Sequence, residues 1–310
     1  MDLSIIIVNW NTKHLLSQCI QSIKSFHPRC EMEIIVVDNG SEDGSAELVR
    51  QNFPEVILIE NGSNLGFGKA NNIGMSKSTG RYVCLVNSDV RILRDCLDNL
   101  CGFMNHDPLI AIAGPRVHNP DMTLQDSCRR FPSLWTCFCE AFGLSSLFRQ
   151  SALFCGEHMF YFSHSKTMRV DSLAGCFLMV KREALDEVGG FDERFFIYAE
   201  EVDWCKRFWR QGWEVVFYPG AAIIHDHAGS SSKDPFRFAV ERERSLIKYW
   251  KKHHSFLSRV LFYSICSAGH LGRVLLGSAA CILKPSLKQD ISQRILKHKM
   301  CLKVFMRQGF

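Results

Sequence analysis

Four short runs of apolar residues in the first 90 positions are each followed by polar or glycine-rich residues. These runs are residues 4–8, 33–37, 56–59 and 82–86. The segments between them have apolar side chains at helical spacing, and they are residues 15–26, 45–52 and 69–77. Continuous apolar runs of this length suit strands that are buried on both faces of a parallel sheet. The alternation of strand and helix therefore predicts an α/β fold with a mostly parallel central sheet flanked by helices.

The same alternation continues less regularly after residue 90. Further strands are predicted at residues 110–113, 170–180, 214–218 and 222–224, and further helices at 93–105, 181–188 and 200–211. Ser45 is a predicted N-cap of the helix that it begins, and Gly212 is predicted to end the helix before it. Residues 117–166 have poor periodicity and many Pro, Ser and aromatic residues, so no element is predicted there.

The C-terminal part of the chain has a different composition. Residues 235–252 have a helical pattern, and residues 256–283 are apolar with interruptions at Arg259, His270 and Arg273. No stretch free of these interruptions reaches the roughly 20 residues that a membrane-spanning helix needs. This favours an interfacial helix or a helix pair lying on a membrane. A buried helix that packs on the catalytic domain is the alternative.

We therefore predict two regions. A catalytic domain is expected over residues 1–235, with a nucleotide-binding half at about 1–115 and an acceptor and catalytic half at about 116–235. A helical, basic and apolar extension is expected over residues 236–310.

Composition narrows the class of protein only moderately. The chain has 310 residues, with 46% hydrophobic and 22% charged residues, which is ordinary for a globular protein. Its 14 cysteines include no CxxC pair, which favours a reducing, cytosolic compartment, and the N-terminus does not resemble a signal peptide. The net charge of +5 comes with a basic tail that begins near Arg237. Such a tail suits an anionic partner, either a membrane surface or phosphate, although a solvated basic face is an equal alternative.

Polar residues follow three of the predicted strands, at residues 9–12, 38–41 and 87–89. Ligands of open α/β sheets bind at the carboxyl ends of the strands, so these loops are the expected site. The Asn87-Ser88-Asp89 segment is the most informative, because a carboxylate there can hold a hard divalent cation and, through it, a phosphate. Alternatively, Asn87 and Asp89 only start a turn or cap a following helix.

Several nucleotide-binding classes are disfavoured by missing motifs. Asp38 follows a strand, which is the position of the acid that hydrogen-bonds a base or ribose in nucleotide-binding proteins. A dinucleotide site would also need a GxGxxG motif after the first strand, and none is present there. The glycine-rich loop at residues 66–71 follows the third strand and lacks the final glycine, so NAD-dependent hydride transfer is disfavoured. A P-loop is absent, and no aromatic-basic stripe suggests nucleic-acid binding.

A second group of acids follows the aromatic segment at residues 195–198. Glu200, Glu201 and Asp203 begin a predicted helix, where acids interact favourably with the helix dipole. Behind such an apolar segment they are expected to be partly buried, and a carboxylate in that environment suits a general base. His225 follows a strand end, and its imidazole with Asp89 and phosphate oxygens could form a Mn²⁺ or Mg²⁺ site.

Taken in order, these segments resemble a known family. They are SIIIVNWN, VVDNGSEDGS, NLGFGKANNIG, LVNSDV, GPRVHNPDMTLQDSCRRFP, GGFDERFFIYAEEVDWCKR and an HxxxGSS loop. The set is similar to family 2 inverting glycosyltransferases of the GT-A fold, and within them to the rhamnosyltransferase-like branch that builds bacterial surface polysaccharides. The resemblance covers about residues 3–250.

This resemblance implies an activity and a location. It implies that a sugar moves from a nucleotide-sugar donor, with dTDP-rhamnose as a branch-based guess, to a saccharide acceptor on a polyprenyl diphosphate carrier. It also implies a cytoplasmic protein that sits peripherally on the inner face of the cell membrane, with no nucleic-acid partner.

The resemblance also implies roles for individual residues. The nucleotide sugar would be bound by Val8, Asn9, Asn11, Asp38, Asn64, Gly66, Asn71, Asn87 and Ser88. Asp89 would be the metal ligand of a DxD-like motif in which Asn87 replaces the first acid, and the metal would be Mg²⁺ or Mn²⁺. His225 would bind the metal or the diphosphate, with His227 as the second choice. Glu201 stands at the position of the catalytic base where Asp is usual, so Glu200 and Asp203 remain alternatives.

Two other functions are compatible with parts of this pattern. A non-catalytic protein could keep the nucleotide-sugar pocket. The one feature that favours it is the glutamate at position 201, where the family usually has Asp. A nucleotidyltransferase would need a GGxGxRL-like loop near the N-terminus, and residues 3–14 do not contain one.

Overall fold

The computed structural model divides into two compact units. It describes residues 1–26, 29–226, 234–283 and 288–308. The first unit comprises Met1–Arg129 and Ser163–Lys233, and the second comprises Arg130–Phe162 and Asp234–Phe310. The segment for which the sequence pattern predicted no element thus lies mostly in the same unit as the C-terminal helices, whereas the predicted boundaries assigned it to the catalytic domain.

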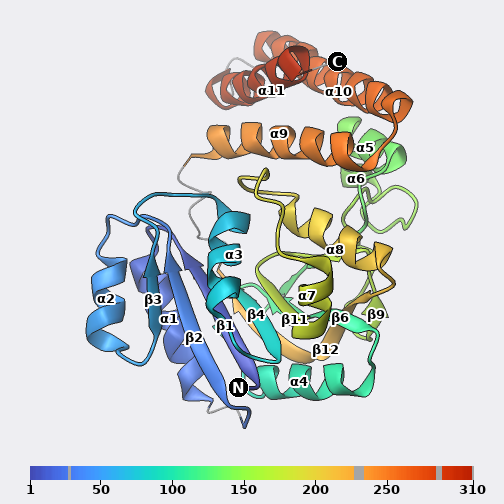
Figure 1. Ribbon diagram of the computed structural model, residues 1–310. Coiled ribbons are helices and arrows are strands. Elements are labelled where there is room, and N and C mark those ends of the chain that lie inside the picture. Colours follow the sequence, from blue (N-terminus) through green and yellow to red (C-terminus); the bar gives the residue numbers. More distant parts are fainter. Residues whose placement is uncertain (27–28, 227–233, 284–287, 309–310) are drawn as a thin grey trace. The chain divides into compact units, whose positions relative to one another are not determined.

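A ten-stranded sheet forms the centre of the first unit (Figure 1). Its main strand order is β3-β2-β1-β4-β11-β6-β12-β5, with β7 beside β6 and β9 beside β12. The strands are β1 (Leu3–Asn9), β2 (Met32–Asp38), β3 (Ile57–Glu60), β4 (Tyr82–Asn87), β5 (Val90–Ile92), β6 (Ile110–His118), β7 (Leu124–Gln125), β9 (Met168–Arg169), β11 (Phe177–Lys181) and β12 (Glu214–His225). A separate ribbon pairs β8 (Cys128–Arg129) with β10 (Ser172–Leu173).

Strands β3, β2, β1 and β4 are parallel to one another, and β6 is parallel to β12. Strand β11 is antiparallel to both β4 and β6, and β5 is antiparallel to β12. The four parallel strands are the apolar runs that the sequence pattern identified. Their side chains are buried along almost their whole length in β1, β2 and β4, as expected for strands covered on both faces.

Helices cover both faces of this sheet. They are α1 (Lys13–Ser25), α2 (Ser45–Asn52), α3 (Phe67–Lys77), α4 (Cys96–His106), α7 (Arg182–Val188) and α8 (Glu200–Arg210). Alternate residues of β1 divide between the two layers, as the strand period of two requires. Leu3, Ile5 and Ile7 share a core cluster with residues of α1 and α4. Ile6 faces α3, where a Cβ added to Gly74 would lie 2.5 Å from the Ile6 side chain.

The segment after β4 corrects one alternative from the sequence. Ser88 and Asp89 do lie in a turn. Asn87 and Asp89 do not cap a following helix, because the short strand β5 comes next and α4 begins only at Cys96. Asp95 precedes α4 with a φ of 60°. The polar Asn-Ser-Asp segment therefore connects two strands that lie apart in the sheet, which leaves its side chains at the sheet edge.

Other predicted boundaries also differ. Ser45 is the first residue of α2 and not its N-cap, because Gly44 takes that position with a φ of 80° and the Ser45 hydroxyl bonds Asp43. Gln211 caps α8, and Gly212 follows it with a φ of 87°. The two strands predicted before His225 are one strand, β12, with an irregularity in its pairing with β6. The strand predicted at residues 170–180 is broken into β10 and β11.

The second unit is helical. It contains α5 (Leu134–Ala141), α6 (Leu144–Leu147), α9 (Pro235–His253), α10 (Phe256–Leu283) and α11 (Lys288–Gln308). Its aromatic core includes Trp250 of α9, which stacks on Phe262 of α10 with ring centroids 4.5 Å apart. Gly269 of α10 lets α5 approach, because an added Cβ would lie 2.7 Å from the Cβ of Ala141. This close approach explains why a segment far away in the sequence joins the C-terminal helices.

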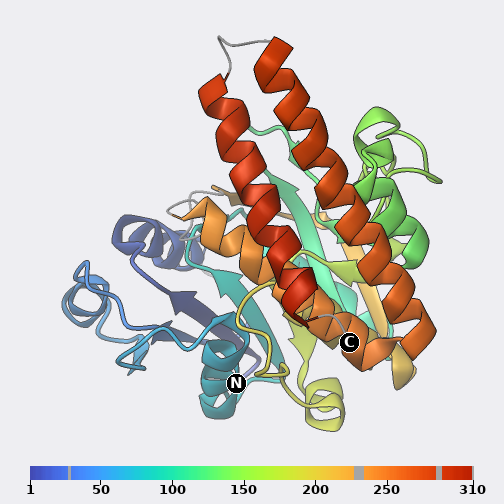
Figure 2. The same cartoon turned by 90° about the horizontal axis from the view of Figure 1, so that it is seen from above.

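Helix α10 runs beside α11 (Figure 2). Among the described residues, it is the one helix that is long and apolar enough to cross a membrane by length and composition. Phe262, Tyr263, Cys266, Gly269 and His270 of α10 are buried, whereas Leu275, Leu276, Ile282 and Leu283 are exposed. Helix α10 therefore packs on its neighbours over only part of its length.

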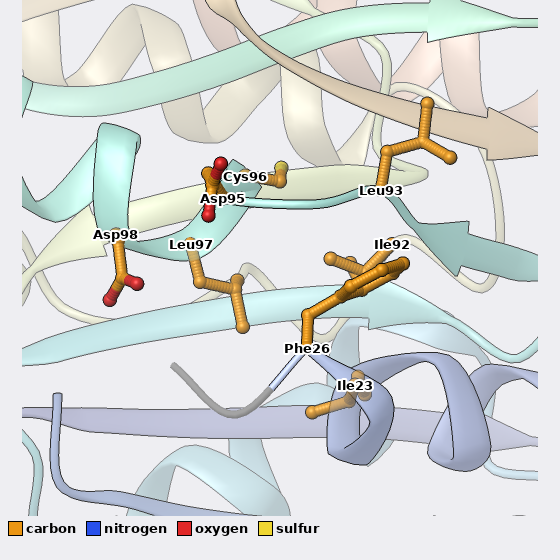
Figure 3. A pocket seen from close by; sticks show the side chains of 8 residues that line it. All are labelled: Ile23, Phe26, Ile92, Leu93, Asp95, Cys96, Leu97 and Asp98. Atoms are coloured by element: carbon orange, nitrogen blue, oxygen red, sulfur yellow. The ribbon is translucent and has the colours of Figure 1, made fainter. Parts of the chain in front are cut away.

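A small cavity lies between α1 and α4 (Figure 3). Side chains such as Ile23 and Leu97 line it, and its volume of about 10 Å³ is close to that of a single water probe. It contains none of the predicted site residues, and its volume leaves no room for a nucleotide sugar.

Candidate active site

The parallel strands bring several predicted site residues to one edge of the sheet. In the register of β1, Asn9 lies opposite Asp38 of β2, and Val8 lies opposite Asn87 of β4. Asn9 and Asp38 are buried, whereas Val8 and Asn87 are half-buried. The carboxyl ends of three strands thus meet where the sequence predicted a nucleotide pocket.

A directional hydrogen-bond network connects these strand ends. Asn9 Nδ2 donates to Asp38 Oδ1 at 3.0 Å, so its Oδ1 is left to accept from the Thr12 hydroxyl at 2.7 Å. Since Thr12 has donated its only proton, the Ser88 hydroxyl must donate to Thr12 Oγ1, 2.7 Å away. The position of Asp38 is therefore coupled to that of Ser88, the residue before the predicted metal ligand.

The loops after β1 and β2 are held together by Ser41. Its backbone N–H donates to Asp38 Oδ2 at 2.9 Å, and its hydroxyl oxygen accepts from Asn9 Nδ2 and from the Asn11 backbone N–H. Asn11 has a left-handed φ of 54°, which Asn tolerates better than most residues, and its Oδ1 accepts from the Glu42 N–H at 2.8 Å. Both oxygens of Asp38 are thereby fixed in orientation at the edge of the site.

The loop before α3 has a supporting role that the sequence did not indicate. Asn64 Oδ1 accepts from Asn39 Nδ2 and from the Gly66 N–H, both at 3.0 Å. Gly66 has a φ of 89° and lies against the Phe196 carbonyl. The predicted ligand Asn71 is buried on α3, and its Nδ2 donates to the Phe67 carbonyl at 3.0 Å. This bond lies within α3 and uses one of the two N–H donors of the Asn71 amide.

Asp89 and His225 are brought together by the pairing of β5 with β12. His225 lies opposite Val90 in that register, and the Asp226 N–H donates to the Asp89 carbonyl at 3.0 Å. As a result, Asp89 Oδ1 lies 3.3 Å from His225 Nε2. Asp89 is 6% exposed and His225 is 8% exposed. His227, the second choice from the sequence, lies outside the described residues.

This pair fits a divalent cation by its chemistry. A carboxylate oxygen and an imidazole nitrogen are both ligands that Mn²⁺ and Mg²⁺ sites accept. His225 Nδ1 lies 2.7 Å from Gln125 Oε1, so the other ring nitrogen is the one directed at Asp89. Such a contact to an oxygen is the usual arrangement for the outer nitrogen of a metal-bound histidine. Nearby, the Asn87 backbone N–H donates a hydrogen bond to the Cys176 carbonyl at 2.9 Å.

The three acids of α8 have different environments. Glu200 is 3% exposed and Asp203 is fully buried, whereas Glu201 is half-buried. Asp203 Oδ2 accepts from Arg207 Nε at 3.0 Å, so it forms an ion pair within the helix. Of these three residues, Glu201 is the least buried.

The backbone before these acids is in an unusual conformation. Tyr198 and Ala199 have φ angles of 70° and 64°, although neither is a glycine. Such conformations cost about 1–3 kcal/mol each and occur often at functional sites. They turn the chain so that α8 begins with Glu200 and Glu201 at its N-terminus.

The environment of this turn changes the ionisation of both glutamates. Burial raises the pKa of Glu201 above its usual value, although the charge of Arg129 opposes the shift. Burial, followed by the charge of Glu201, raises the pKa of Glu200 well above its usual value. Glu200 Oε2 has no hydrogen-bond partner among the described residues. Glu200 is therefore favoured in its neutral form, beside a more accessible Glu201.

Gly175 and Cys176 lie between Glu201 and the end of β4. A Cβ built on Gly175 would lie 3.6 Å from Glu201 Cγ, and the Cys176 carbonyl accepts from the Asn87 N–H. The absence of a side chain at Gly175 therefore leaves room for Glu201 close to the Asn87-Ser88-Asp89 segment. The structure thus brings the predicted base and the predicted metal ligands to the same part of the first unit.

Sequence reasoning missed several residues of this site. Thr12, Asn39, Ser41, Gln125 and Arg129 bond or face predicted site residues, but none was assigned a role. The first three lie in the polar loops after strands, so their position was a usable signal. Gln125 and Arg129 lie in a segment without periodicity, and only the fold shows that they come near His225 and Glu201.

Comparison with known proteins identifies relatives of this chain. The family model described as "Glycosyl transferase family 2" matches residues 4–189, and "N-terminal domain of galactosyltransferase" matches residues 158–228. The N-acetylglucosaminyl-diphospho-decaprenol L-rhamnosyltransferase of Mycobacterium tuberculosis is 30% identical over 252 residues, covering 72% of this chain and 76% of the relative. The low-salt glycan biosynthesis hexosyltransferase Agl10 of Haloferax volcanii is 28% identical over 246 residues, covering 76% and 70%.

Solved structures show the same fold. The mannosyltransferase PcManGT from Pyrobaculum calidifontis, solved in complex with GDP-Man and Mn²⁺, has a TM-score of 0.59 at 16% identity. That alignment covers 99% of this chain and 86% of the other. GalNAc-T7, solved with UDP, GalNAc and Mn²⁺, has a TM-score of 0.57 and covers 100% and 56%. The predicted fold class, a GT-A-type α/β domain with a C-terminal helical extension, is confirmed.

Proposed function

Because the chain belongs to glycosyl transferase family 2 and is a glycosyltransferase, we propose that it transfers a sugar with inversion from a nucleotide-sugar donor to a saccharide hydroxyl. The observation that carries this proposal is the position of Glu201. Glu201 lies beside Gly175, the neighbour of Cys176, and the Cys176 carbonyl accepts from the Asn87 N–H. It is also the least buried of the three acids.

The donor nucleotide binds, in this proposal, at the ends of β1 and β2. Asn9, Asn11 and Asp38 are held by Ser41 and Thr12 in fixed orientations, which lowers the entropic cost of recognising a base or ribose. Val8, Asn87 and Ser88 line the same strand ends. Asn64 and Gly66 support this pocket by shaping the loop against Phe196, and Asn71 supports it from within α3.

Asp89 and His225 hold a divalent metal, Mg²⁺ or Mn²⁺, in this proposal. When bound, such a metal supplies positive charge that stabilises the departing nucleoside diphosphate. Support comes from the 3.3 Å approach of a carboxylate oxygen to an imidazole nitrogen, and from the Mn²⁺ in the two structures of the same fold.

Glu201 acts as the general base in this mechanism. As a new bond forms between the acceptor oxygen and the anomeric carbon, the bond from that carbon to the diphosphate oxygen breaks, and its electron pair leaves with the diphosphate. The acceptor proton passes to the Glu201 carboxylate. A raised pKa makes that carboxylate a better proton acceptor than an ordinary glutamate. Asp203 is less suitable because Arg207 occupies it, and Glu200 is less suitable because it is buried and favoured in the neutral form.

The relative from Mycobacterium tuberculosis suggests the substrates. Its name describes an L-rhamnosyltransferase that acts on a decaprenyl-linked saccharide. We therefore propose dTDP-rhamnose as the donor and a saccharide on a polyprenyl diphosphate as the acceptor, within the synthesis of a bacterial cell-envelope polysaccharide.

Such an acceptor places the reaction at the cytoplasmic surface of the cell membrane, where the C-terminal helices would make peripheral contact. Helix α10 exposes large apolar side chains, including Leu275 and Leu276, which are 62% and 74% exposed. Exposed lysines of the neighbouring α11, such as Lys297 and Lys303, supply positive charge for anionic lipid. This proposal keeps α10 in the interface and does not require it to span the bilayer.

Calorimetric titration tests the donor and the metal together. Wild type and Asp89→Ala are titrated with a panel of nucleotide sugars, each with Mn²⁺, with Mg²⁺ and with EDTA. We expect one donor to bind with metal dependence in the wild type and to lose most of that affinity in the variant. Binding that is independent of both metal and Asp89 would contradict the metal site. Binding of a different donor would contradict only the rhamnose assignment.

A further inference from the structure

Three helices of the second unit bring three potential metal ligands together. They are Glu243 of α9, His270 of α10 and Cys301 of α11. One donor atom from each side chain lies within 4.8 Å of the donor atoms of the other two. All three residues are buried, with exposed fractions of 7%, 8% and 1%. A carboxylate, an imidazole and a thiol therefore converge inside a helical unit whose core is otherwise largely apolar and aromatic.

The Glu243 carboxylate has no close counter-charge in this cluster. Its Oε1 lies 3.9 Å from His270 Nε2 and 4.0 Å from Arg242 Nη1. Both distances exceed the about 2.7–3.2 Å of a well-formed N–H···O hydrogen bond. A buried carboxylate is costly unless a cation lies close to it. The space between Glu243 and its neighbours therefore favours a further positive charge.

The two guanidinium groups near this cluster have closer partners in α5. Arg242 Nη2 lies 3.3 Å from Glu140 Oε2, and Arg273 Nη2 donates to the Glu140 carbonyl at 2.5 Å. Both arginines are thus directed toward Glu140. Their contacts with α5 leave the space between the three donor side chains to a smaller cation.

His270 is oriented by contacts on the side of its ring away from Glu243. Its Nδ1 lies 3.1 Å from His298 Nδ1, whereas its Nε2 faces Glu243. The ring also packs against Phe305, with ring centroids 5.8 Å apart. Contacts of this kind to the outer nitrogen orient many metal-bound histidines. The imidazole is therefore already turned with one nitrogen toward the other two donors.

The chemistry of the three donors selects the class of metal. Thiolate, imidazole and carboxylate are the ligands of Zn²⁺, with bonds of about 2.0–2.3 Å in tetrahedral geometry. Donor atoms around such an ion lie about 3.3–3.8 Å apart, so the side chains need to close by roughly 1 Å. Mg²⁺ and Ca²⁺ take oxygen ligands and are disfavoured by the thiol.

We propose that Glu243, His270 and Cys301 form a Zn²⁺ site that holds α9, α10 and α11 together, with water as the fourth ligand. On binding, a sulfur–zinc bond replaces the S–H bond of Cys301, and the proton leaves to solvent. This site belongs to the second unit, whereas Asp89 and His225 belong to the first. The inference is independent of the transfer reaction proposed above.

The first experiment measures metal binding by the full chain without a polyhistidine tag. Bound metal is removed with EDTA, the chelator is washed out, and Zn²⁺ or Co²⁺ is added. We expect one equivalent of Zn²⁺ that Asp89→Ala retains, because that substitution removes a ligand only from the first unit. With Co²⁺, we expect the charge-transfer absorption of a cobalt–thiolate bond, again in both proteins.

Variants of the ligands locate the metal. Cys301→Ser and His270→Gln should each weaken Zn²⁺ binding at least 100-fold, because loss of a direct ligand should exceed the roughly 10–100-fold effect of losing an outer partner. Cys301→Ser should also abolish the cobalt–thiolate absorption. Cys281→Ser changes a half-buried cysteine of α10 outside the cluster and is the matched control. It should leave Zn²⁺ affinity and the absorption unchanged.

Hydrogen exchange of the wild type tests the same site if the variants do not fold. With free Zn²⁺ at ten times the dissociation constant, exchange that requires α9, α10 and α11 to separate should slow about tenfold. A wild type that binds no Zn²⁺ would overturn the proposal, as would binding by Cys301→Ser within twofold of the wild type. Loss of the Zn²⁺ in Asp89→Ala would also overturn it, because the metal would then belong to the first unit.

Discussion

Gly66 and Phe196 approach each other so closely that a Cβ on Gly66 would lie 2.5 Å from the Phe196 carbonyl oxygen. The same carbonyl accepts from the Phe67 N–H at 2.9 Å. This contact joins the loop before α3 to the aromatic segment before α8. The loop that leads to Glu201 is therefore positioned by a glycine of the nucleotide-binding half.

We expect Gly66→Ala to destabilise the protein and to weaken donor binding. The substitution combines an unfavourable positive φ with a backbone clash, and we expect a cost of about 2–4 kcal/mol in the free energy of unfolding. Gly212→Ala is the matched control, because its φ of 87° is nearly the same and nothing lies within 4 Å of the added Cβ. Denaturant unfolding of both variants separates the clash from the φ strain. Equal losses of stability would show that the Phe196 contact is unimportant.

Glu201→Gln should reduce the rate of transfer by about 10²–10⁴-fold while donor affinity stays near that of the wild type. Glutamine has a similar shape but cannot accept the acceptor proton. Single-turnover transfer and calorimetric donor binding measure the two effects separately. Glu183→Gln, which changes an exposed carboxylate on α7, is the control and should be unaffected. Unimpaired turnover in Glu201→Gln would remove Glu201 from the role of base.

Glu200→Gln should make stability less dependent on pH. The folded-state pKa of Glu200 is raised, so its contribution to stability is present below its unfolded pKa and is lost as the pH rises toward the folded value. In that window the wild type loses up to about 1.4 kcal/mol per pH unit, because unfolding lets the group ionise. A glutamine does not ionise, so the difference in Tm between variant and wild type should grow as the pH rises above the usual pKa of a glutamate. A constant difference would mean that Glu200 is ionised in the fold.

The helical unit should be sensitive to acid through His298. Burial, followed by the charge of His270, lowers the pKa of His298 to about 4. A histidine with a lowered pKa is neutral in the fold and protonates on unfolding, so its stabilising contribution is lost as the pH falls from about 6.5 toward 4. Glu243 acts in the same direction. Burial alone would raise its pKa, but the hydrogen bond from His270 and the charge of Arg242 lower it.

His298→Gln should therefore reduce the acid-dependent loss of stability between pH 6.5 and pH 4. Hydrogen exchange of α10 and α11, followed by mass spectrometry, measures this effect in the unit that contains the histidine. His106→Gln changes an exposed histidine of the first unit and serves as the control. An unchanged acid response in His298→Gln would assign the sensitivity to other groups.

Leu275→Glu combined with Leu276→Glu should release the protein from lipid. Both side chains are exposed on α10, and burying a leucine in a membrane interface contributes about 1.5–3 kcal/mol, so the vesicle-bound fraction should fall at least tenfold. Flotation with vesicles of phosphatidylglycerol and phosphatidylcholine measures it. Leu109→Glu is the control, since Leu109 is 51% exposed in the first unit. Retained binding by the double variant would exclude this face of α10 as the contact.

The amino-acid sequence by itself determined the framework of the first unit. The apolar runs of β1, β2 and β4 and the helices between them follow from local periodicity, because residues buried on both faces of a sheet have no polar alternation. The apolar run of β3 also predicted a strand, although β3 is the edge strand and its residues are exposed or half-buried. The order of polar loops after these strands also indicated the edge at which Asn9, Asp38 and Asp89 meet. Parallel strands place such ends side by side, so sequence position alone suffices for that inference.

Only the tertiary structure decided how the second half completes the site. His225 reaches Asp89 because β5 and β12 pair antiparallel, and Gln125 reaches His225 because of a hairpin in a segment without periodicity. The different roles of Glu200, Glu201 and Asp203 depend on burial and on Arg207, which adjacent positions in a sequence do not reveal. Pairings between distant segments depend on the summed packing of many residues, so no local pattern of apolar and polar positions specifies them.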